Sequence, residues 1–228
     1  MPSQSIPFPR ILMGPGPSTL APRVLEALSR APLGHLDPEL FPILDEIQEG
    51  LRGVFGTNNS FTIANTGTGM AGMECSIANL IEPGDNALIG VHGFFGDRLC
   101  EMASRYGANV VRLDAEWGKP LDTDAMASAA ANAGKLKLIA CVHAETSTGV
   151  RQPLEPIAEI ARRHDALFLV DAVTSLGGLP VAVDRVGADV CYSGTQKCMG
   201  SPPGLSPVTV SERAFQSALV RKTKVIAL

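Results

Sequence analysis

Ala166-Leu-Phe-Leu-Val-Asp171 is an apolar run of strand length that ends in a carboxylate. Asp189-Val-Cys-Tyr192 is a second apolar run, and it leads directly into Ser193-Gly-Thr-Gln-Lys197. A near-continuous apolar run is typical of a strand that is buried on both faces of a parallel sheet. Such sheets bind their ligands at the carboxyl ends of the strands. The stretch therefore predicts that Asp171 and Lys197 face one crevice.

The sequence around this stretch alternates between short apolar runs and helical periodicity. The predicted strands are 60–64, 87–91, 109–113, 136–142, 166–170, 189–192 and 206–210. The predicted helices are 22–29, 42–55, 70–81, 97–106, 122–133 and 154–164. This alternation predicts an α/β fold, with a mostly parallel sheet covered by helices on both faces. We expect an N-terminal arm at 1–20, in which Ser18 or Thr19 could cap the first helix, and one large domain at 21–228.

The composition is that of an ordinary globular protein. The 228 residues are 45% apolar and 18% charged, with a formal net charge of −4, so no basic surface is expected to attract nucleic acid. There is no apolar run of the roughly 18 residues that a membrane span needs, and no secretion signal at the start. The five cysteines include no C-x-x-C pair, which argues against disulfides or a zinc site. We expect a cytoplasmic protein without a metal or a membrane partner.

A lysine and a carboxylate in one crevice fit pyridoxal phosphate. The lysine can hold the cofactor as an imine, and the carboxylate can keep the pyridine nitrogen protonated. Either residue alone has an ordinary explanation, because an aspartate after a strand is often a helix cap and a single lysine is usually solvated. Their combination makes Lys197 and Asp171 the candidate catalytic residues.

A glycine-rich turn supplies a candidate phosphate site. Asn65-Thr-Gly-Thr-Gly-Met-Ala-Gly72 follows the predicted strand 60–64 and opens a helix, so backbone amides and the helix dipole favour an anion there. The same glycines match G-x-G-x-x-G, so a nucleotide-binding oxidoreductase is an alternative. That motif requires an acidic residue at the end of the next strand, but the strand 87–91 continues into His92-Gly-Phe-Phe95.

Two further clusters follow predicted strands. Phe94 and Phe95 are expected in the loop after the strand 87–91, where an aromatic ring could stack on a flat cofactor, although phenylalanines in such a place more often belong simply to the core. His143-Ala-Glu-Thr-Ser-Thr-Gly149 places polar side chains after the strand 136–142. Polar residues are common in ordinary turns, so this cluster only supports the hypothesis of a site.

Five motifs, in this order, together resemble one family. They are Gly14-Pro-Gly-Pro17, Thr66-Gly-Thr-Gly69, His143-Ala-Glu-Thr-Ser-Thr-Gly149, Val170-Asp-Ala-Val173 and Ser193-Gly-Thr-Gln-Lys197. From about Ile11 to Lys224 the chain resembles the class V aminotransferases of fold type I. Within that class it is similar to the alanine-glyoxylate and serine-glyoxylate (serine-pyruvate) aminotransferase family.

The resemblance implies pyridoxal 5′-phosphate as cofactor and a role for each site residue. Lys197 would form the Schiff base, and Asp171 would pair with the pyridinium nitrogen. Val173 and Phe95 would lie against the two faces of the ring, with Phe95 in place of the tryptophan that is usual in the family. The contacts to the phosphate and the ring hydroxyl would fall to Thr68, Gly69, Gln196 and Thr146.

The activity implied is transamination of a small amino acid, alanine or serine, with glyoxylate or pyruvate as acceptor, in a homodimer. Ureidoglycine-glyoxylate aminotransferases are similar at Glu116-Trp-Gly118 and Asp165-Ala-Leu-Phe168, so the amino donor stays open. A lyase or a cysteine desulfurase is also an alternative, because class V contains both and a fold does not fix a reaction.

Family chains continue into a small C-terminal domain that supplies an arginine for the substrate carboxylate. This sequence ends at Val225-Ile-Ala-Leu228 without that domain, so we expect a truncated chain with weakened cofactor binding. A catalytically silent cofactor-binding or interaction fragment is therefore a second hypothesis.

Overall fold

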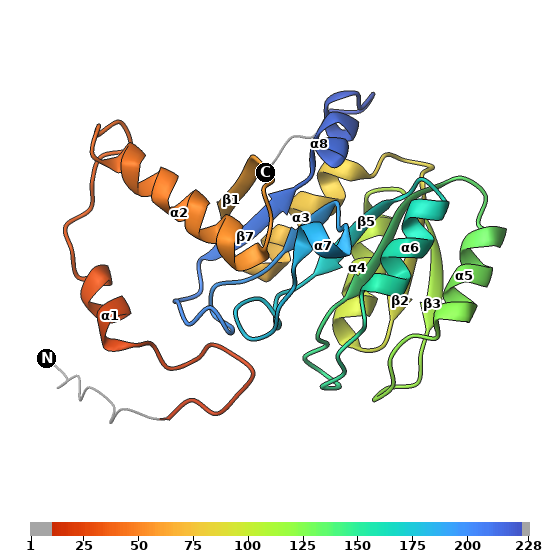
Figure 1. Cartoon of the computed structure of the whole chain (residues 1–228), viewed down its shortest axis with the longest axis horizontal. Helices are drawn as coiled ribbons and strands as arrows, with labels where there is room; N and C mark the ends of the chain where they lie inside the picture. Colours follow the sequence, from red (N-terminus) through yellow and green to blue (C-terminus); the bar gives the residue numbers. More distant parts are fainter. Residues whose placement is uncertain (1–10, 225–228) are drawn as a thin grey trace, which may run out of the picture.

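The computed structural model describes residues 11–224 and shows one seven-stranded sheet with helices on both faces (Figure 1). The strands lie in the order β1-β7-β6-β5-β4-β2-β3. They are β1 (Phe61–Thr66), β2 (Asn86–Val91), β3 (Asn109–Asp114), β4 (Leu136–Val142), β5 (Leu167–Asp171), β6 (Val190–Tyr192) and β7 (Leu205–Val210). The helices are α1 (Pro22–Leu28), α2 (Leu40–Phe55), α3 (Gly69–Leu80), α4 (Phe94–Arg105), α5 (Thr123–Asn132), α6 (Glu155–Arg163), α7 (Val183–Val186) and α8 (Glu212–Leu219).

The sheet is mostly parallel, as predicted. The strands β3, β2, β4, β5 and β6 pair in parallel. The strand β7 is antiparallel to both of its neighbours, β6 and β1. The carboxyl ends of the parallel strands therefore lie along one edge of the sheet, together with the start of β7.

The two faces of the sheet carry separate hydrophobic cores, which explains the continuous apolar run of β5. Leu167 and Leu169 pack with α3, α4 and α8, whereas Phe168 and Val170 pack with α5, α6 and α7. Successive side chains of a strand point to opposite faces, so a strand covered on both sides must be apolar at every position. The same alternation turns the last residue of β5, Asp171, toward the face of α3 and α4.

Some helix bounds differ from the prediction. The helix α4 begins at Phe94 rather than near Asp97, and the short helix α7 and the helix α8 were not predicted. The expected cap of the first helix is wrong, because Ala21 is the N-cap residue of α1 and makes no side-chain capping bond. The hydroxyls of Ser18 and Thr19 instead contact Lys197 and Leu12.

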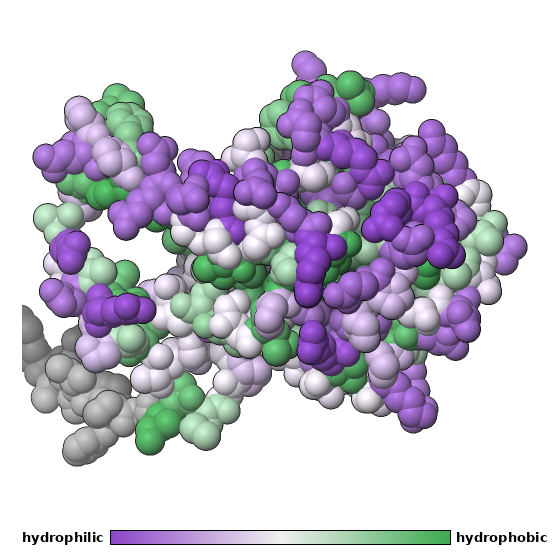
Figure 2. Space-filling view, in the orientation of Figure 1, coloured by the Kyte–Doolittle hydropathy of each residue, from purple (hydrophilic) through white to green (hydrophobic). Residues whose placement is uncertain are grey.

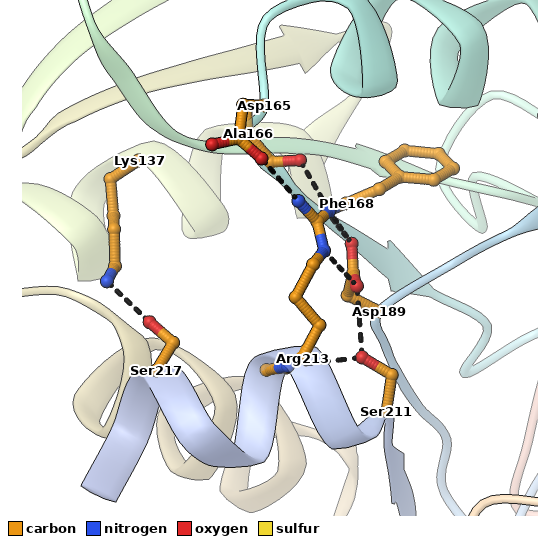
Figure 3. A network of polar contacts seen from close by, with 9 residues as sticks. Lys137, Asp165, Ala166, Phe168, Asp189, Ser211, Arg213 and Ser217 are labelled. Atoms are coloured by element: carbon orange, nitrogen blue, oxygen red, sulfur yellow. Dashed lines mark hydrogen bonds and ion pairs between the residues drawn. The ribbon is translucent and has the colours of Figure 1, made fainter. Parts of the chain in front are cut away.

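A buried carboxylate joins α8 to the strands at the edge opposite the carboxyl ends (Figure 3). Asp189 accepts hydrogen bonds from the backbone N–H of Phe168 at 2.9 Å and from the hydroxyl of Ser211 at 2.9 Å. The guanidinium of Arg213 binds both carboxylate oxygens of Asp189 and also donates to the carbonyl of Ala166 at 2.8 Å. This network fixes the register of α8 against β5 and β6.

The N-terminal part of the chain extends from the α/β body, with which, among the described residues, only the end of α2, at Leu51 and Phe55, shares a buried core. In Figure 1, α1 and α2 extend to the left, and Figure 2 shows apolar side chains on their surface. Those side chains include Leu25, Leu28, Phe41, Ile43 and Ile47, each at least 43% exposed.

Two expectations concern ends of the chain that fall outside the described residues. These are the first half of the arm predicted at 1–20 and the end of the chain at 225–228. Within residues 11–224, no helix is long and apolar enough to span a membrane.

Candidate active site

Asp171 and Lys197 lie at the same edge of the sheet, as the sequence predicts. Asp171 is the last residue of β5 and is paired with Tyr192, the last residue of β6. Lys197 follows β6 by five positions, and its positive charge lowers the pKa of Asp171. The structure therefore places the amine and the carboxylate at one edge of the sheet, near enough for the charge of one to affect the other.

Asp171 is buried but well supplied with donors. Its carboxylate accepts from the backbone N–H of Val173 at 2.9 Å and from the hydroxyl of Tyr192 at 2.7 Å. Burial raises the pKa of Asp171 to about 6, and the two hydrogen bonds oppose that rise. The group is thus mainly ionised at neutral pH and would be stabilised by a cation.

The N-terminal arm lies directly against Lys197. Gly16 has a φ of +120°, and a Cβ at this position would lie 2.5 Å from Cδ of Lys197 and 2.8 Å from the carbonyl oxygen of Gln196. The hydroxyl of Ser18 donates to the carbonyl of Lys197 at 3.2 Å. Both the backbone conformation and the close approach require glycine at position 16.

The glycine-rich turn forms the N-terminus of α3. Thr68 is the N-cap residue, but its side chain makes no capping hydrogen bond, so the first amides of α3 are open to an anion. A Cβ at Gly69 would lie 2.7 Å from Val173, and one at Gly194 would lie 3.2 Å from the nitrogen of Gly69. Glycine is needed here for the close packing of α3 against the loops that follow β5 and β6.

The position of β1 contradicts the dinucleotide alternative. In a dinucleotide-binding unit the glycine-rich turn joins two adjacent parallel strands. Here β1 and β2 are separated by four strands, and within residues 11–224 β1 pairs only with the antiparallel β7.

Gln196 has an unsatisfied polar atom at this place. Its Oε1 is buried and has no hydrogen-bond partner among the described residues. The same atom lies 3.1 Å from where a Cβ of Gly194 would be. An amide next to the open N-terminus of α3 could bind an anionic ligand by donating from its NH2 group, once the side chain is turned to face the ligand.

The loop after β4 is anchored by Glu145, to which the sequence analysis gave no role. Its buried carboxylate accepts from the backbone N–H groups of Phe95 and Ser147, at 3.1 Å each, and from the hydroxyl of Ser147 at 2.8 Å. The hydroxyl of Ser147 in turn accepts from the N–H of Phe94. A carboxylate at a helix N-terminus is favoured by the helix dipole. Glu145 thereby explains why Phe94 and Phe95 begin α4 and do not lie in a loop.

Phe95 and Thr146 are held next to this anchor. The half-buried ring of Phe95 packs edge-on against Phe94, with 5.3 Å between the ring centroids. The hydroxyl of Thr146 is hydrogen-bonded to that of Thr174, the residue after Val173. The loops that follow β2, β4 and β5 are thus tied together at the carboxyl edge.

The geometry defines a site for a ligand with a positive and a negative end. It combines a lysine amine, a buried carboxylate suited to a cation and a helix N-terminus suited to an anion. This combination is typical of an enzyme that binds a charged organic cofactor, and the chain belongs to the class-V aminotransferase family, whose sequence profile matches residues 12–225.

Two curated relatives and one crystal structure show which members of the family the chain is similar to. The chain is 43% identical to alanine-glyoxylate aminotransferase of Rattus norvegicus over 96% of this chain and 52% of the relative. It is 43% identical to (S)-ureidoglycine-glyoxylate transaminase of Bacillus subtilis (strain 168) over 93% of this chain and 51% of the relative. The crystal structure of alanine-glyoxylate aminotransferase from Nostoc sp. superposes with a TM-score of 0.95 at 48% identity, covering 99% of this chain and 60% of that one. The chain spans about half the length of the curated relatives it matches.

Proposed function

We propose that the chain is the cofactor-binding part of a pyridoxal-phosphate-dependent aminotransferase. In our proposal it transfers the amino group of a small amino acid, alanine or serine, to glyoxylate or pyruvate. The observation that carries the proposal is that the buried Asp171 ends β5 and Lys197 follows the neighbouring β6 at the same edge of the sheet, where the charge of Lys197 lowers the pKa of Asp171. Family membership supports the reaction class.

The residues present fit this cofactor. The uncapped N-terminus of α3 marks the place for a phosphate, with Thr68 and Gly69 beside it, and the side-chain amide of Gln196, whose Oε1 has no partner among the described residues, would turn its NH2 group to donate to that phosphate. Asp171 would hold the proton on the pyridine nitrogen. Val173 and Phe95 would flank the ring, and Thr146 would lie near its hydroxyl.

Different residues of this chain would have different roles in the reaction. When bound, pyridoxal phosphate supplies an electron sink for the charge left at the substrate Cα. Lys197 would hold the cofactor through Nζ and then, once the substrate has displaced it, carry the proton to and from Cα. Asp171 would keep the positive charge on the ring, and the arm at Gly16 would restrict the path of the Lys197 side chain.

The relatives favour glyoxylate as the acceptor and leave the donor open. The rat and Bacillus subtilis relatives both carry glyoxylate in their names, but one is named for alanine and the other for (S)-ureidoglycine. Because the identities are equal at 43%, ureidoglycine is retained as an alternative donor.

We further propose a cytoplasmic homodimer, in which residues 1–20 form an arm and residues 21–228 a cofactor-binding large domain. The exposed apolar side chains of α1 and α2 support an association (Figure 2). The contact of the arm with Lys197 supports counting it as part of the site.

The test is to load the purified chain with pyridoxal phosphate and record its visible absorbance. We expect an imine band and, after borohydride reduction, a covalent label on Lys197 by mass spectrometry. Lys197→Ala should lose both signals, whereas Lys119→Ala, which removes a surface lysine paired with Glu116, should keep them.

Transamination is then assayed with glyoxylate and alanine, serine or (S)-ureidoglycine. A label on Lys197 without turnover would support the silent cofactor-binding fragment. A folded chain with no imine band would overturn the proposal itself.

A further inference from the structure

Tyr192 is a buried polar group that the reaction as described above does not use. It is one of two tyrosines in the chain, its side chain is fully buried, and its hydroxyl donates to Oδ2 of Asp171 at 2.7 Å. The two residues are register partners at the ends of the neighbouring parallel strands β5 and β6. Their side chains therefore project from the same face of the sheet.

The ring of Tyr192 is held in place by α3. A Cβ at Gly72 would lie 3.0 Å from Cβ of Tyr192 and 2.2 Å from the hydroxyl of Ser206, so this turn of α3 rests on the tyrosine. A hydroxyl on a ring packed this tightly has little freedom to turn away from its acceptor. The hydrogen bond to Asp171 is thus built into the fold.

The hydrogen bonds to Asp171 leave room for further donors on both carboxylate oxygens. Oδ1 accepts from Val173 and Oδ2 accepts from Tyr192, and each carboxylate oxygen can accept two hydrogen bonds. We propose that Tyr192 is a positioning residue, whose hydroxyl keeps Asp171 ionised and aimed at the ring nitrogen of the cofactor. The inference rests on the proposed function.

The charges around Asp171 show why one hydroxyl matters. Glu145, in the loop after β4, disfavours the ionised carboxylate by its charge, and the charge of Lys197 favours it. The thiols of Cys141 on β4 and Cys191 on β6 are fully buried, which raises their pKa values and keeps them neutral. Burial itself raises the pKa of Asp171, so the two hydrogen bonds are the main local groups that oppose protonation.

Loss of the hydroxyl would change the carboxylate in a defined direction. Tyr192→Phe keeps the ring that packs against Gly72 but leaves Oδ2 of Asp171 without its donor. The pKa of Asp171 should then rise further above about 6, so that more of the group is protonated near neutral pH. A protonated carboxyl cannot hold a positive charge on the ring nitrogen.

The experiment measures the affinity for pyridoxal phosphate, by absorbance titration, across a pH series. For Tyr192→Phe we expect roughly tenfold weaker binding at neutral pH, the size expected for a hydrogen bond to a charged group. We also expect the acid-side loss of affinity to move to higher pH. The matched control is Tyr106→Phe, which removes the other tyrosine hydroxyl and its 2.8 Å bond to Glu74, at the far end of α4.

A second variant separates a structural effect from the proposed one. If Tyr192 acts through the charge of Asp171, adding Tyr192→Phe to Asp171→Asn should change the affinity little. Equal weakening at every pH, or full additivity with Asp171→Asn, would overturn the inference. If the wild-type chain itself forms no imine on Lys197, the proposed function fails first, and the two failures are therefore distinguishable.

Discussion

Asp171 and His143 have opposite pH dependences although a backbone hydrogen bond of 2.8 Å joins them. Burial raises the pKa of Asp171 to about 6 and lowers that of His143 to about 4. Between these values the folded protein holds a proton on Asp171 that the unfolded chain has released. Over the same range it lacks a proton on His143 that the unfolded chain binds. The two effects on stability therefore oppose each other in acid.

Replacing Asp171 should reveal how much the ionisation of this residue contributes to the pH dependence of stability. Relative to Asp171→Asn, the wild type should gain up to roughly 3 kcal/mol in its free energy of unfolding as the pH falls from about 6 to about 4, because the cost of a buried charge disappears. Urea unfolding of both proteins across this range checks the prediction. Asp45→Asn, on the exposed surface of α2, is the control. A difference that stays constant with pH would contradict the assigned ionisation.

At the scale of residues, the sequence predicts that Asp171 and Lys197 lie together, but it does not predict which residues hold them in place. Asp171 and Lys197 could be placed together because both follow apolar runs, and the ends of parallel strands meet at one edge. Tyr192 could not be recognised, because its role depends on the register of β5 against β6, which the sequence pattern does not reveal. The effect of Gly16 on Lys197 is equally hidden, since they are far apart in the chain.

Elements are fixed in this protein by polar contacts between distant parts of the chain. The helix α4 begins three residues earlier than its own periodicity suggests, because Glu145 accepts from its first amides. The helix α8 follows β7 after a single residue, Ser211, and is oriented by Asp189 and Arg213 (Figure 3). Sequence periodicity predicts most element centres, but such contacts decide where an element starts and how it is oriented.

Arg213→Met should measure how much the contacts that orient α8 contribute to the stability of the protein. We expect a loss of roughly 2 kcal/mol in the free energy of unfolding, because the buried carboxylate of Asp189 loses two of its four donors. Arg105→Met removes a surface ion pair with Glu101 and should cost no more than about 0.5 kcal/mol. Urea denaturation compares the two variants, and equal losses would show that the network is only a surface feature.

The whole molecule consists of a well-packed α/β body and an extension that adds little to its core. None of residues 11–20 is buried, and α1 has no buried residue. The alternation of strands and helices predicted the body, and the arm at 1–20, expected from the prolines and glycines at the start of the sequence, stays a prediction. The sequence could not predict that β7 would be antiparallel, because both directions of a buried strand have the same apolar pattern.

Removal of residues 1–20 should leave the folding of the chain intact but change the reaction of Lys197 with the cofactor. The shortened chain should keep its free energy of unfolding to within about 1 kcal/mol, since surface changes usually have small effects. Its Lys197 should form the imine with altered kinetics, because the contacts from Gly16 and Ser18 are gone. Denaturation curves and stopped-flow absorbance test the two parts, and a chain that no longer folds would contradict the proposed division into arm and domain.

The pairing of β1 with β7 also determines when the site can form during synthesis. Thr62 and Thr209 share a hydrogen bond across 147 positions of the chain. As a ribosome releases the protein from its N-terminus, β1 must wait for β7 while β2 to β6 can already pair. The glycine-rich turn that follows β1 is therefore among the last parts to settle, so a nascent chain has a sheet before it has a place for the phosphate.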